Sequence, residues 1–472
     1  MGAVEKGSEK HSIDIEIDND SADTSWFTPW RLLGLFCVIN LITYLDRGVI
    51  ASTGVNGVPE TCKPSGECSS GTGLQGEFHL TNGEDGVLSS AFMVGLLIAS
   101  PIFASMAKSM NPFRLVAVGL LIWTFAAIGC GISVGFWSIT VCRMLVGVGE
   151  ASFISLAAPF IDENAPPKQR SAWLGIFYMC IPTGIALGYV YGGLVGGSYG
   201  WRYAFLSEAV MMVPFVILGF VMKPLHLKGI TNAKNAAGSS KDKLGADAQT
   251  TSIVQDIKEL MNEKIYIVNV LGYIAYNFVI GAYSYWGPKA GYSIYHMSNA
   301  DMMFGGITIV GGIVGTLTGG FVLDKLDSTI PNAFKLLSTV TFFGAIFCFS
   351  AFCFKNMYVF MVFFLIGEML IFATQGPVNF VSIHAVKPSL RPLAMAASTV
   401  SIHIFGDVPS SPLVGVMQDH IGNWRTSTLI LTTVLFLAAG IWCIGIFIPF
   451  VDKDDEDIEN PKKSNKTNPF DD

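Results

Sequence analysis

The chain has 472 residues, of which 51% are hydrophobic and only 14% are charged, and its formal net charge is −7. Soluble proteins carry about 25% charged residues, so this composition cannot cover the surface of soluble domains and indicates an integral membrane protein instead. The net charge is mild and the basic residues are scattered, which argues against a nucleic-acid partner and against a basic membrane-surface protein.

Twelve apolar runs are long enough to cross a bilayer as helices, which takes about 20 residues each. They lie at residues 31–53, 86–107, 113–134, 137–159, 171–195, 203–222, 265–286, 302–323, 333–354, 357–381, 393–416 and 427–450. The sequence therefore predicts an all-α integral membrane protein with twelve transmembrane helices.

A long polar stretch at residues 223–264 divides the predicted spans six and six. Its composition is typical of a disordered linker. We therefore expect five parts: a disordered tail at 1–30, a six-helix bundle at 31–222, a linker at 223–264, a second six-helix bundle at 265–450 and an acidic tail at 451–472.

The distribution of Lys and Arg predicts how the chain is oriented. Most of the 29 basic residues fall in segments on the side of the N-terminus, and the opposite side holds only Lys63, Arg202, Lys289, Lys355 and Arg425. Cytoplasmic loops carry the excess of positive charge, so we expect both tails and the linker to be cytoplasmic.

The two halves repeat each other in sequence. Gly149-Glu150 precedes Pro159 as Gly367-Glu368 precedes Pro377, at an offset of about 220 residues. Parallel repeats of six spans joined by a central linker are typical of transporters with the major facilitator fold, which bind substrate between the halves near the membrane midplane. We therefore expect two pseudo-symmetric halves with a substrate site between them.

Ionisable residues inside the predicted spans are candidates for function, because a charge at the bilayer centre costs on the order of 2.5–3.5 kcal/mol. Asp46 and Arg47 lie deep in the first span, Arg143 and Glu150 in the fourth, and Glu368 in the tenth. Arg143 and Glu150 are seven residues apart, which places them on one helix face about 10 Å apart along the axis. We interpret the carboxylates as proton sites that compete for or share the two arginines. The alternative is a permanently paired cluster that only orients the two spans.

Further polar residues in the second half could line the substrate cavity. Gln375 and Asn379 lie on a similar face to Glu368 and are candidate hydrogen-bond partners for a headgroup. His403 and Asp407 are four residues apart in the eleventh span, so they can pair on one helix face. That His could titrate, or the pair could simply be a satisfied contact in the cavity wall.

Four stretches carry a family resemblance: YLDRGVIAS in the first span, VGVGEASFISLAAPFIDE in the fourth, GWRYAF after the fifth, and IHIFGDVPSSPLVGVMQD in the eleventh. Together they resemble the Spinster family, a branch of the major facilitator superfamily associated with lysophospholipid and sphingolipid transport, and they look most like its plant members. The resemblance runs from about Trp26 to Phe450 and implies coupling to protons through Asp46, Arg143 and Glu150.

The superfamily's gating motif is better preserved in the second half than in the first. After the second span the chain reads ASMAKSMNPFR, with Ala107 where the motif expects an acidic residue or its neighbouring Gly. After the eighth span, GGFVLDKL keeps Gly320, Asp324 and Lys325. We expect a salt-bridge latch in the second half, whereas the first half departs from the motif at Ala107.

Cys62 and Cys68 lie in the long loop after the first span, among Gly, Ser and Pro. On a non-cytoplasmic face they could close a small disulfide loop, or the loop could simply be a flexible excursion. The sequence carries no catalytic signature, nucleotide-binding loop or metal-ligand spacing, so we expect neither an enzyme nor a bound cofactor or metal.

The leading interpretation is a secondary transporter that moves a lysophospholipid or sphingoid lipid together with protons by alternating access. We expect a monomer in a late endosomal or lysosomal type of membrane, with another organelle or the plasma membrane as alternatives. A carrier of a small organic anion and a non-transporting sensor or scaffold are the alternative functions. Gly-rich faces on the fifth and eighth spans, including Gly193 and Gly315, are expected to form a seam between the halves that opens to the bilayer.

Overall fold

The computed structural model describes residues 28–62, 68–107, 110–166, 169–222, 255–297, 299–387 and 390–449. The two predicted tails and most of the predicted linker lie outside these residues. The helices of the first half are α1 (Pro29–Ala51), α2 (Thr53–Asn56), α3 (Gly73–Glu77), α4 (Asn82–Met106), α5 (Pro112–Gly131), α6 (Phe136–Asn164), α7 (Arg170–Tyr199) and α8 (Trp201–Val221).

The second half follows a helix at residues 255–262. Its helices are α11 (Lys264–Tyr295), α12 (Ala300–Lys325), α13 (Ile330–Cys353), α14 (Met357–Phe372), α15 (Gln375–His384), α16 (Arg391–Ile402), η2 (His403–Asp407), α17 (Val408–Ile421) and α18 (Trp424–Ile446). Among the described residues, 11 helices are long and apolar enough to cross a membrane, with α14 and α15 counted as one. The predicted eleventh span, 393–416, is built instead from α16, the π-helical turn η2 and α17.

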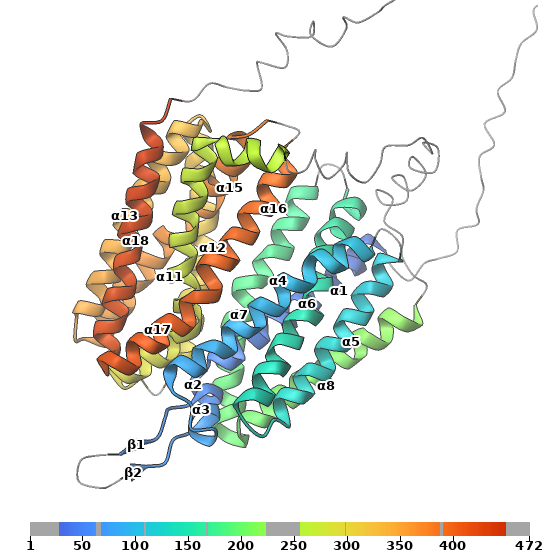
Figure 1. Cartoon of the computed structure of the whole chain (residues 1–472), viewed down its shortest axis with the longest axis vertical. Helices are drawn as coiled ribbons and strands as arrows, with labels where there is room; N and C mark the ends of the chain where they lie inside the picture. Colours follow the sequence, from blue (N-terminus) through green and yellow to red (C-terminus); the bar gives the residue numbers. More distant parts are fainter. Residues whose placement is uncertain are drawn as a thin grey trace, which may run out of the picture.

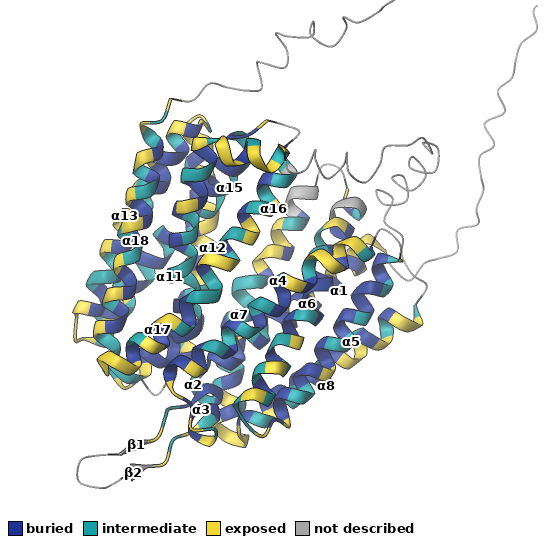
Figure 2. Cartoon of the chain, viewed as in Figure 1, coloured by how far each residue is buried: buried dark blue, intermediate teal, exposed yellow. Residues whose placement is uncertain are grey.

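The helices form two bundles that lie side by side (Figure 1). In the first bundle α4 and α5 pack on α6, and α1 packs on α7; in the second, α13 and α11 pack on α18. Their inward faces are buried and their outward faces exposed (Figure 2). Contacts between the bundles come mainly from α4 against α17 and from α7 against α12.

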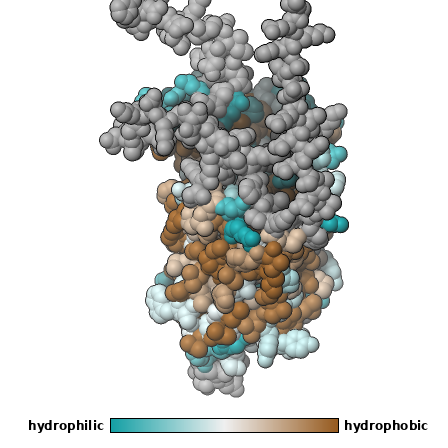
Figure 3. Space-filling model, turned by 90° about the vertical axis from the view of Figure 1, so that its right-hand side faces the viewer, coloured by the Kyte–Doolittle hydropathy of each residue, from teal (hydrophilic) through white to brown (hydrophobic). Residues whose placement is uncertain are grey.

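Large apolar side chains cover the outside of the molecule. Phe125, Val210 and Leu317 are 65%, 70% and 64% exposed, and one face of the molecule shows a broad hydrophobic band (Figure 3). An apolar surface of this extent would aggregate in water, whereas lipid solvates it. The protein is therefore a multi-pass membrane protein.

The two ends of the bundles are distinguished by the segments they carry. We call the end where α1 begins and α18 ends the linker face, and the end that carries the strands β1 (Thr61–Cys62) and β2 (Cys68–Ser69) the hairpin face. Cys62 and Cys68 are directly opposed in the antiparallel pairing. Opposed residues have Cα atoms about 4.5–5.5 Å apart, a spacing that a disulfide can span. Their side chains lie outside the described part, so the disulfide stays a prediction.

The halves are joined at the hairpin face by carboxylates that bind backbone and side-chain donors across the interface. Asp419 on α17 accepts hydrogen bonds from the backbone amides of Asn82 (3.0 Å) and Gly83 (2.8 Å) at the start of α4. Unpaired amides and the helix dipole make a helix N-terminus a favourable site for a carboxylate. Asp301 on α12 accepts similar bonds from the amide (2.8 Å) and hydroxyl (2.6 Å) of Thr53.

A buried lysine adds a second set of bonds between the halves at this face. Lys289 on α11 donates to Asn56 (3.1 Å), to Asp85 (3.4 Å) and to Gln75, all of the first half. Tyr285, one turn earlier, donates to the Asp85 carboxylate at 2.8 Å. The Lys289 and Asp85 side chains are 2% and 0% exposed, so this pair belongs to the sealed interior of the hairpin face.

Proline creates an acceptor for one further bond between the halves. Pro412 lies inside α17 and has no N–H, so it cannot donate to the carbonyl four residues earlier. That carbonyl belongs to Val408, and it accepts a hydrogen bond from the Ser90 hydroxyl of α4. The bond across the halves therefore uses a carbonyl that the helix itself leaves free.

The same device occurs in α11. Pro288 leaves the carbonyl of Ser284 without its helical donor, and the Tyr189 hydroxyl of α7 donates to it at 2.5 Å. These hydrogen bonds between the two halves lie toward the hairpin face. On the other side α16 packs mainly against α11, α15 and η2 of its own half. The bundles thus meet at the hairpin face and diverge toward the linker face (Figure 1).

Candidate functional site

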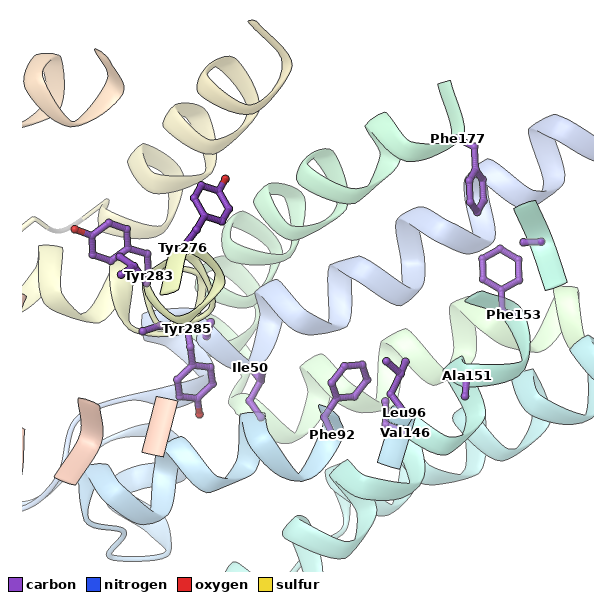
Figure 4. Packing of buried hydrophobic residues seen from close by; sticks show 14 of the residues in the cluster. Ile50, Phe92, Leu96, Val146, Ala151, Phe153, Phe177, Tyr276, Tyr283 and Tyr285 are labelled. Atoms are coloured by element: carbon purple, nitrogen blue, oxygen red, sulfur yellow. The ribbon is translucent and has the colours of Figure 1, made fainter. Parts of the chain in front are cut away.

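A pocket lies between the halves just below the closed hairpin face. Side chains from α1, α4, α6, α7 and α11 line it: Arg47, Ile50, Ser89, Phe92, Met93, Arg143, Ile185, Ser284 and Tyr285. Ile50, Phe92 and Tyr285 bring three different helices together at its apolar wall (Figure 4). Two arginines in an otherwise largely apolar lining are the polar feature of this pocket.

Each arginine is paired with a buried carboxylate of the other helix. Arg143 on α6 donates to both oxygens of Asp46 on α1, at 2.7 and 2.9 Å. Arg47 on α1 donates to Glu150 on α6 at 2.6 Å. The sequence predicted that the carboxylates share or compete for the arginines; in this conformation each has its own.

Burial differs between the two ion pairs. Asp46 and Arg143 are 0% and 1% exposed, whereas Arg47 remains 17% exposed beside a fully buried Glu150. Because Arg47 keeps this exposure, its pair is the one that reaches the pocket most directly. Breaking either pair would leave an uncompensated buried charge, at a cost of about 3–5 kcal/mol.

Aromatic rings replace water around the two guanidinium groups. The Phe92 ring centre lies 4.6 Å from the guanidinium carbon of Arg47 and 5.5 Å from that of Arg143. Tyr44 lies 4.3 Å from Arg47 on its own helix. Cation–π contacts of desolvated arginines contribute about 2 kcal/mol each. Phe92 thus links both pairs and holds their charges at the pocket wall.

Sequence reasoning missed a third carboxylate of this cluster. Glu208 on α8 is fully buried, and no donor group among the described residues is bonded to either of its oxygens. It lies beside Asp46 and Arg143. The signal was present, since Glu208 lies inside the predicted span 203–222, and the rule that selected Asp46 selects it equally.

The residues of the hairpin-face contacts were missed for a different reason. Asp85 and Asp301 each lie one residue before a predicted span, and Lys289 lies three residues after one. Apolar windows end where charges begin, so the prediction placed all three in loops. The helices continue past them, and the opposite half buries them.

The predicted polar residues of the second half are only partly brought together. Gln375 donates to the Tyr276 hydroxyl at 3.1 Å, and Asn379 donates back to the carbonyl of Gln375 at 2.9 Å. Glu368 is buried on α14, and its Oε2 has no hydrogen-bond partner among the described residues. The Asn379 side chain therefore donates a hydrogen bond within its own helix. Of these residues, Glu368 is the one with an oxygen available to bind a substrate.

His403 and Asp407 form the predicted pair, with Nδ1 and Oδ2 2.6 Å apart. They are the first and last residues of η2, and π-helical turns occur frequently at functional sites. Asp407 also lies within electrostatic reach of Tyr44 and Arg47 of the first half. The π-helical turn of the eleventh span thus places a carboxylate on the arginine side of the pocket.

The gating residues lie at the linker-face end of α12. Asp324 and Lys325 are exposed there, Asp324 accepts a hydrogen bond from Ser328 at 3.3 Å, and Lys325 lies 4.6 Å from the Phe321 ring centre. Gly320 has open space where a Cβ would stand. These contacts stay within α12 and the turn that follows it, and the role of the motif as a latch stays a prediction.

The glycine seam differs from the expectation at one of its two named positions. A Cβ on Gly193 would meet Asp301 at 2.6 Å, so Gly193 lies where α7 meets α12. A Cβ on Gly315 would meet the carbonyl of Met369 at 2.4 Å. Gly315 therefore packs inside the second half, against α14, and its expected place at the seam is wrong.

Comparison with known proteins defines the class of protein. The profile of the Major Facilitator Superfamily matches residues 36–406. Solved structures share the fold: a bacterial homolog of the human lysosomal transporter Spinster, in an inward-facing and unoccupied conformation, matches with a TM-score of 0.72 at 16% identity over 89% of this chain and 97% of that one. The D-xylose–proton symporter matches with a TM-score of 0.66 over 89% of this chain and 98% of its own. The protein is a major facilitator, a secondary transporter and not an enzyme.

Curated relatives narrow the class further. "Probable sphingolipid transporter spinster homolog 2" of Arabidopsis thaliana is 65% identical over 94% of this chain and 93% of its own length. Human "Protein spinster homolog 1" is 27% identical over 84% of this chain and 75% of its own. The chain belongs to the spinster family.

Proposed function

We propose that the protein carries a sphingoid lipid or a lysophospholipid across a membrane by proton-coupled alternating access. The observation that carries the proposal is the pair of buried ion pairs, Asp46 with Arg143 and Glu150 with Arg47, at the wall of the pocket between the halves. The names of the Arabidopsis relatives support the choice of lipid.

The pocket suits a molecule with a charged head and an apolar tail. Arg47 lines the pocket and is the cation for a phosphate, and Asp407 of the second half, within electrostatic reach of Arg47, is a carboxylate for an amine. Apolar and aromatic side chains such as Ile50 and Phe92 make up the wall of the pocket. A tail placed against them gains about 0.8 kcal/mol for each CH₂ removed from water.

Proton coupling follows from the chemistry of the ion pairs. Protonation of Glu150 removes its charge and releases Arg47, which is then free to bind a headgroup phosphate. Protonation of Asp46 acts in the same way on Arg143. Each buried charge needs a partner, and binding of a proton or of a substrate changes which partner it has. The two together therefore shift the population between the two access states.

Reconstituted protein in liposomes tests this function. A panel of labelled lipids, sphingosine, sphingosine phosphate and lysophosphatidylcholine, is offered with and without an imposed pH gradient. We expect accumulation of at least one lipid that follows the gradient, and we expect Glu150→Gln and Asp46→Asn to abolish the gradient-driven part while the protein still inserts and stays monodisperse. Gradient dependence equal to that of wild type in both variants would refute the assigned residues.

The same assay separates the two alternative functions. Arg47 has an Nε without a hydrogen-bond partner among the described residues, which favours a small organic anion as second candidate. Saturable uptake of a soluble anion that no lipid competes for would identify an anion carrier. Absence of transport together with lipid binding would identify a sensor or scaffold.

We further propose that the protein acts as a monomer in a late endosomal or lysosomal type of membrane, with both termini in the cytoplasm. The distribution of Lys and Arg supports this orientation, and the hairpin face would then face the lumen. Protease protection of tags at the two ends in isolated organelles tests the orientation, and co-localisation with compartment markers tests the membrane.

A further inference from the structure

Glu208 is a buried carboxylate with no evident role in packing. It belongs to α8 of the first half, it is fully buried, and no donor group among the described residues is bonded to either of its oxygens. Its neighbours are Asp46 and Arg143, and Arg143 lines the pocket. A polar group left in this state costs about 1–3 kcal/mol, and more when it is charged. Its environment must therefore supply either a counter-charge or a proton.

The charges in the cluster show whether Glu208 receives a counter-charge or a proton. Glu150 and Arg47 balance each other in one pair. In the other group Arg143 is a single cation between two carboxyl groups, Asp46 and Glu208. If both were ionised, a net negative charge would be buried in a low dielectric, whereas one bound proton makes the group neutral. Asp46 already holds both of its oxygens at the Arg143 guanidinium, so Glu208 is the member left for the proton.

We propose that Asp46 and Glu208 form a carboxyl pair that binds one coupling proton, with Glu208 as the residue that carries it. The proton comes from water on the pocket side and forms an O–H bond on Glu208, which donates a hydrogen bond to the Asp46 carboxylate. When the proton leaves, the pair is left with two negative charges beside one arginine, and their repulsion weakens the contact between α1 and α8. This inference rests on the proposed proton coupling and adds Glu208 to the carboxyl groups, Asp46 and Glu150, that take part in it.

The other groups around Glu208 do not replace this role. α7 contributes Tyr191, whose hydroxyl is bonded to Ser207, and α5 contributes Cys130, a buried thiol. From α1 and α6 only Asp46 and Arg143 face it, and α2 carries no titratable side chain. Neither a phenol nor a thiol supplies a counter-charge near neutral pH, so the balance between Asp46, Glu208 and Arg143 stands.

Infrared difference spectroscopy of the purified full chain in lipid, titrated with pH, tests the pair directly. A protonated carboxylic acid has its own carbonyl-stretch band. We expect Glu208→Gln to remove one such band, and we expect Asp46→Asn to remove the same band, because Glu208 would then ionise against Arg143. Glu368→Gln should remove a different band or none. Tyr191→Phe, a change on the adjoining helix outside the pair, should leave the band intact.

The spectrum decides this inference, and lipid transport decides the function on which it rests. Size-exclusion profiles and substrate counterflow, which needs no proton gradient, establish that each variant is folded. With the proton site removed, Glu208→Gln should keep counterflow and lose gradient-driven accumulation. A band unchanged in Glu208→Gln, or absent from wild type, overturns the assignment. A wild-type protein that shows the band and moves no lipid would instead overturn the proposed function.

Discussion

Replacing Lys289 by Met should open the hairpin face. The methionine keeps the length and apolar stem of the side chain. It removes the ammonium group that donates hydrogen bonds to Asp85, Asn56 and Gln75. In the closed state Asp85 would be left buried with Tyr285 as its remaining strong donor, a loss of about 3–5 kcal/mol. When the halves part at this face, water reaches Asp85 and the cost disappears.

The whole penalty therefore falls on the closed state. About 3 kcal/mol corresponds to roughly a hundredfold change in the ratio of the two access states. Spin labels at Tyr199 and Tyr358, exposed residues of opposite halves at the hairpin-face ends of their helices, would report this shift as a longer distance. The double variant Lys289→Met with Asp85→Asn should recover part of it, because the unpaired charge is gone. Unchanged distances together with unchanged turnover in the single variant would refute the reasoning.

Three further predictions concern other parts of the molecule. Asp419→Asn replaces the carboxylate at the start of α4 with a weaker acceptor, so the hairpin face should close less firmly, by about 1 kcal/mol, measured with the same labels. Gly86→Ala places a Cβ 2.4 Å from a carbonyl of α17 and should hold the halves apart and stop transport, whereas Gly320→Ala, with open space around it, should leave the fold and the labelled distances unchanged. A non-reduced digest of untreated protein should contain a peptide cross-linked between Cys62 and Cys68, and free thiols at both positions would exclude the bridge.

Periodicity and composition were enough to predict the architecture because lipid imposes length and apolarity on every span. The eleventh span is helical without interruption from residue 391 to residue 421, and a π-helical turn at 403–407 lies just before Pro409 and Pro412. The predicted span that is interrupted is the tenth, between α14 and α15. Sequence pattern alone predicts neither the π-helical turn nor this interruption.

The sequence predicted which residues belong to the site, but not which carboxylate pairs with which arginine. The rule that intramembrane charge indicates function selected Asp46, Arg143 and Glu150, but helix spacing cannot say which carboxylate meets which arginine. That choice depends on how α1 packs against α6 and on Phe92, which comes from a third helix. Lys289 and Asp301 were out of reach for a similar reason, since each is buried only by the opposite half.

Each carbonyl that a proline frees binds a side chain of the other half, so the two halves of the chain must carry matching residues at these positions. Pro412 frees the Val408 carbonyl that the Ser90 hydroxyl binds, and Pro288 frees the Ser284 carbonyl that the Tyr189 hydroxyl binds. An alanine at either proline would restore a helical N–H that competes with the distant hydroxyl for this carbonyl. Chimeras that join the first half of one transporter to the second half of another should therefore close well only when each proline and its hydroxyl come from matching parents.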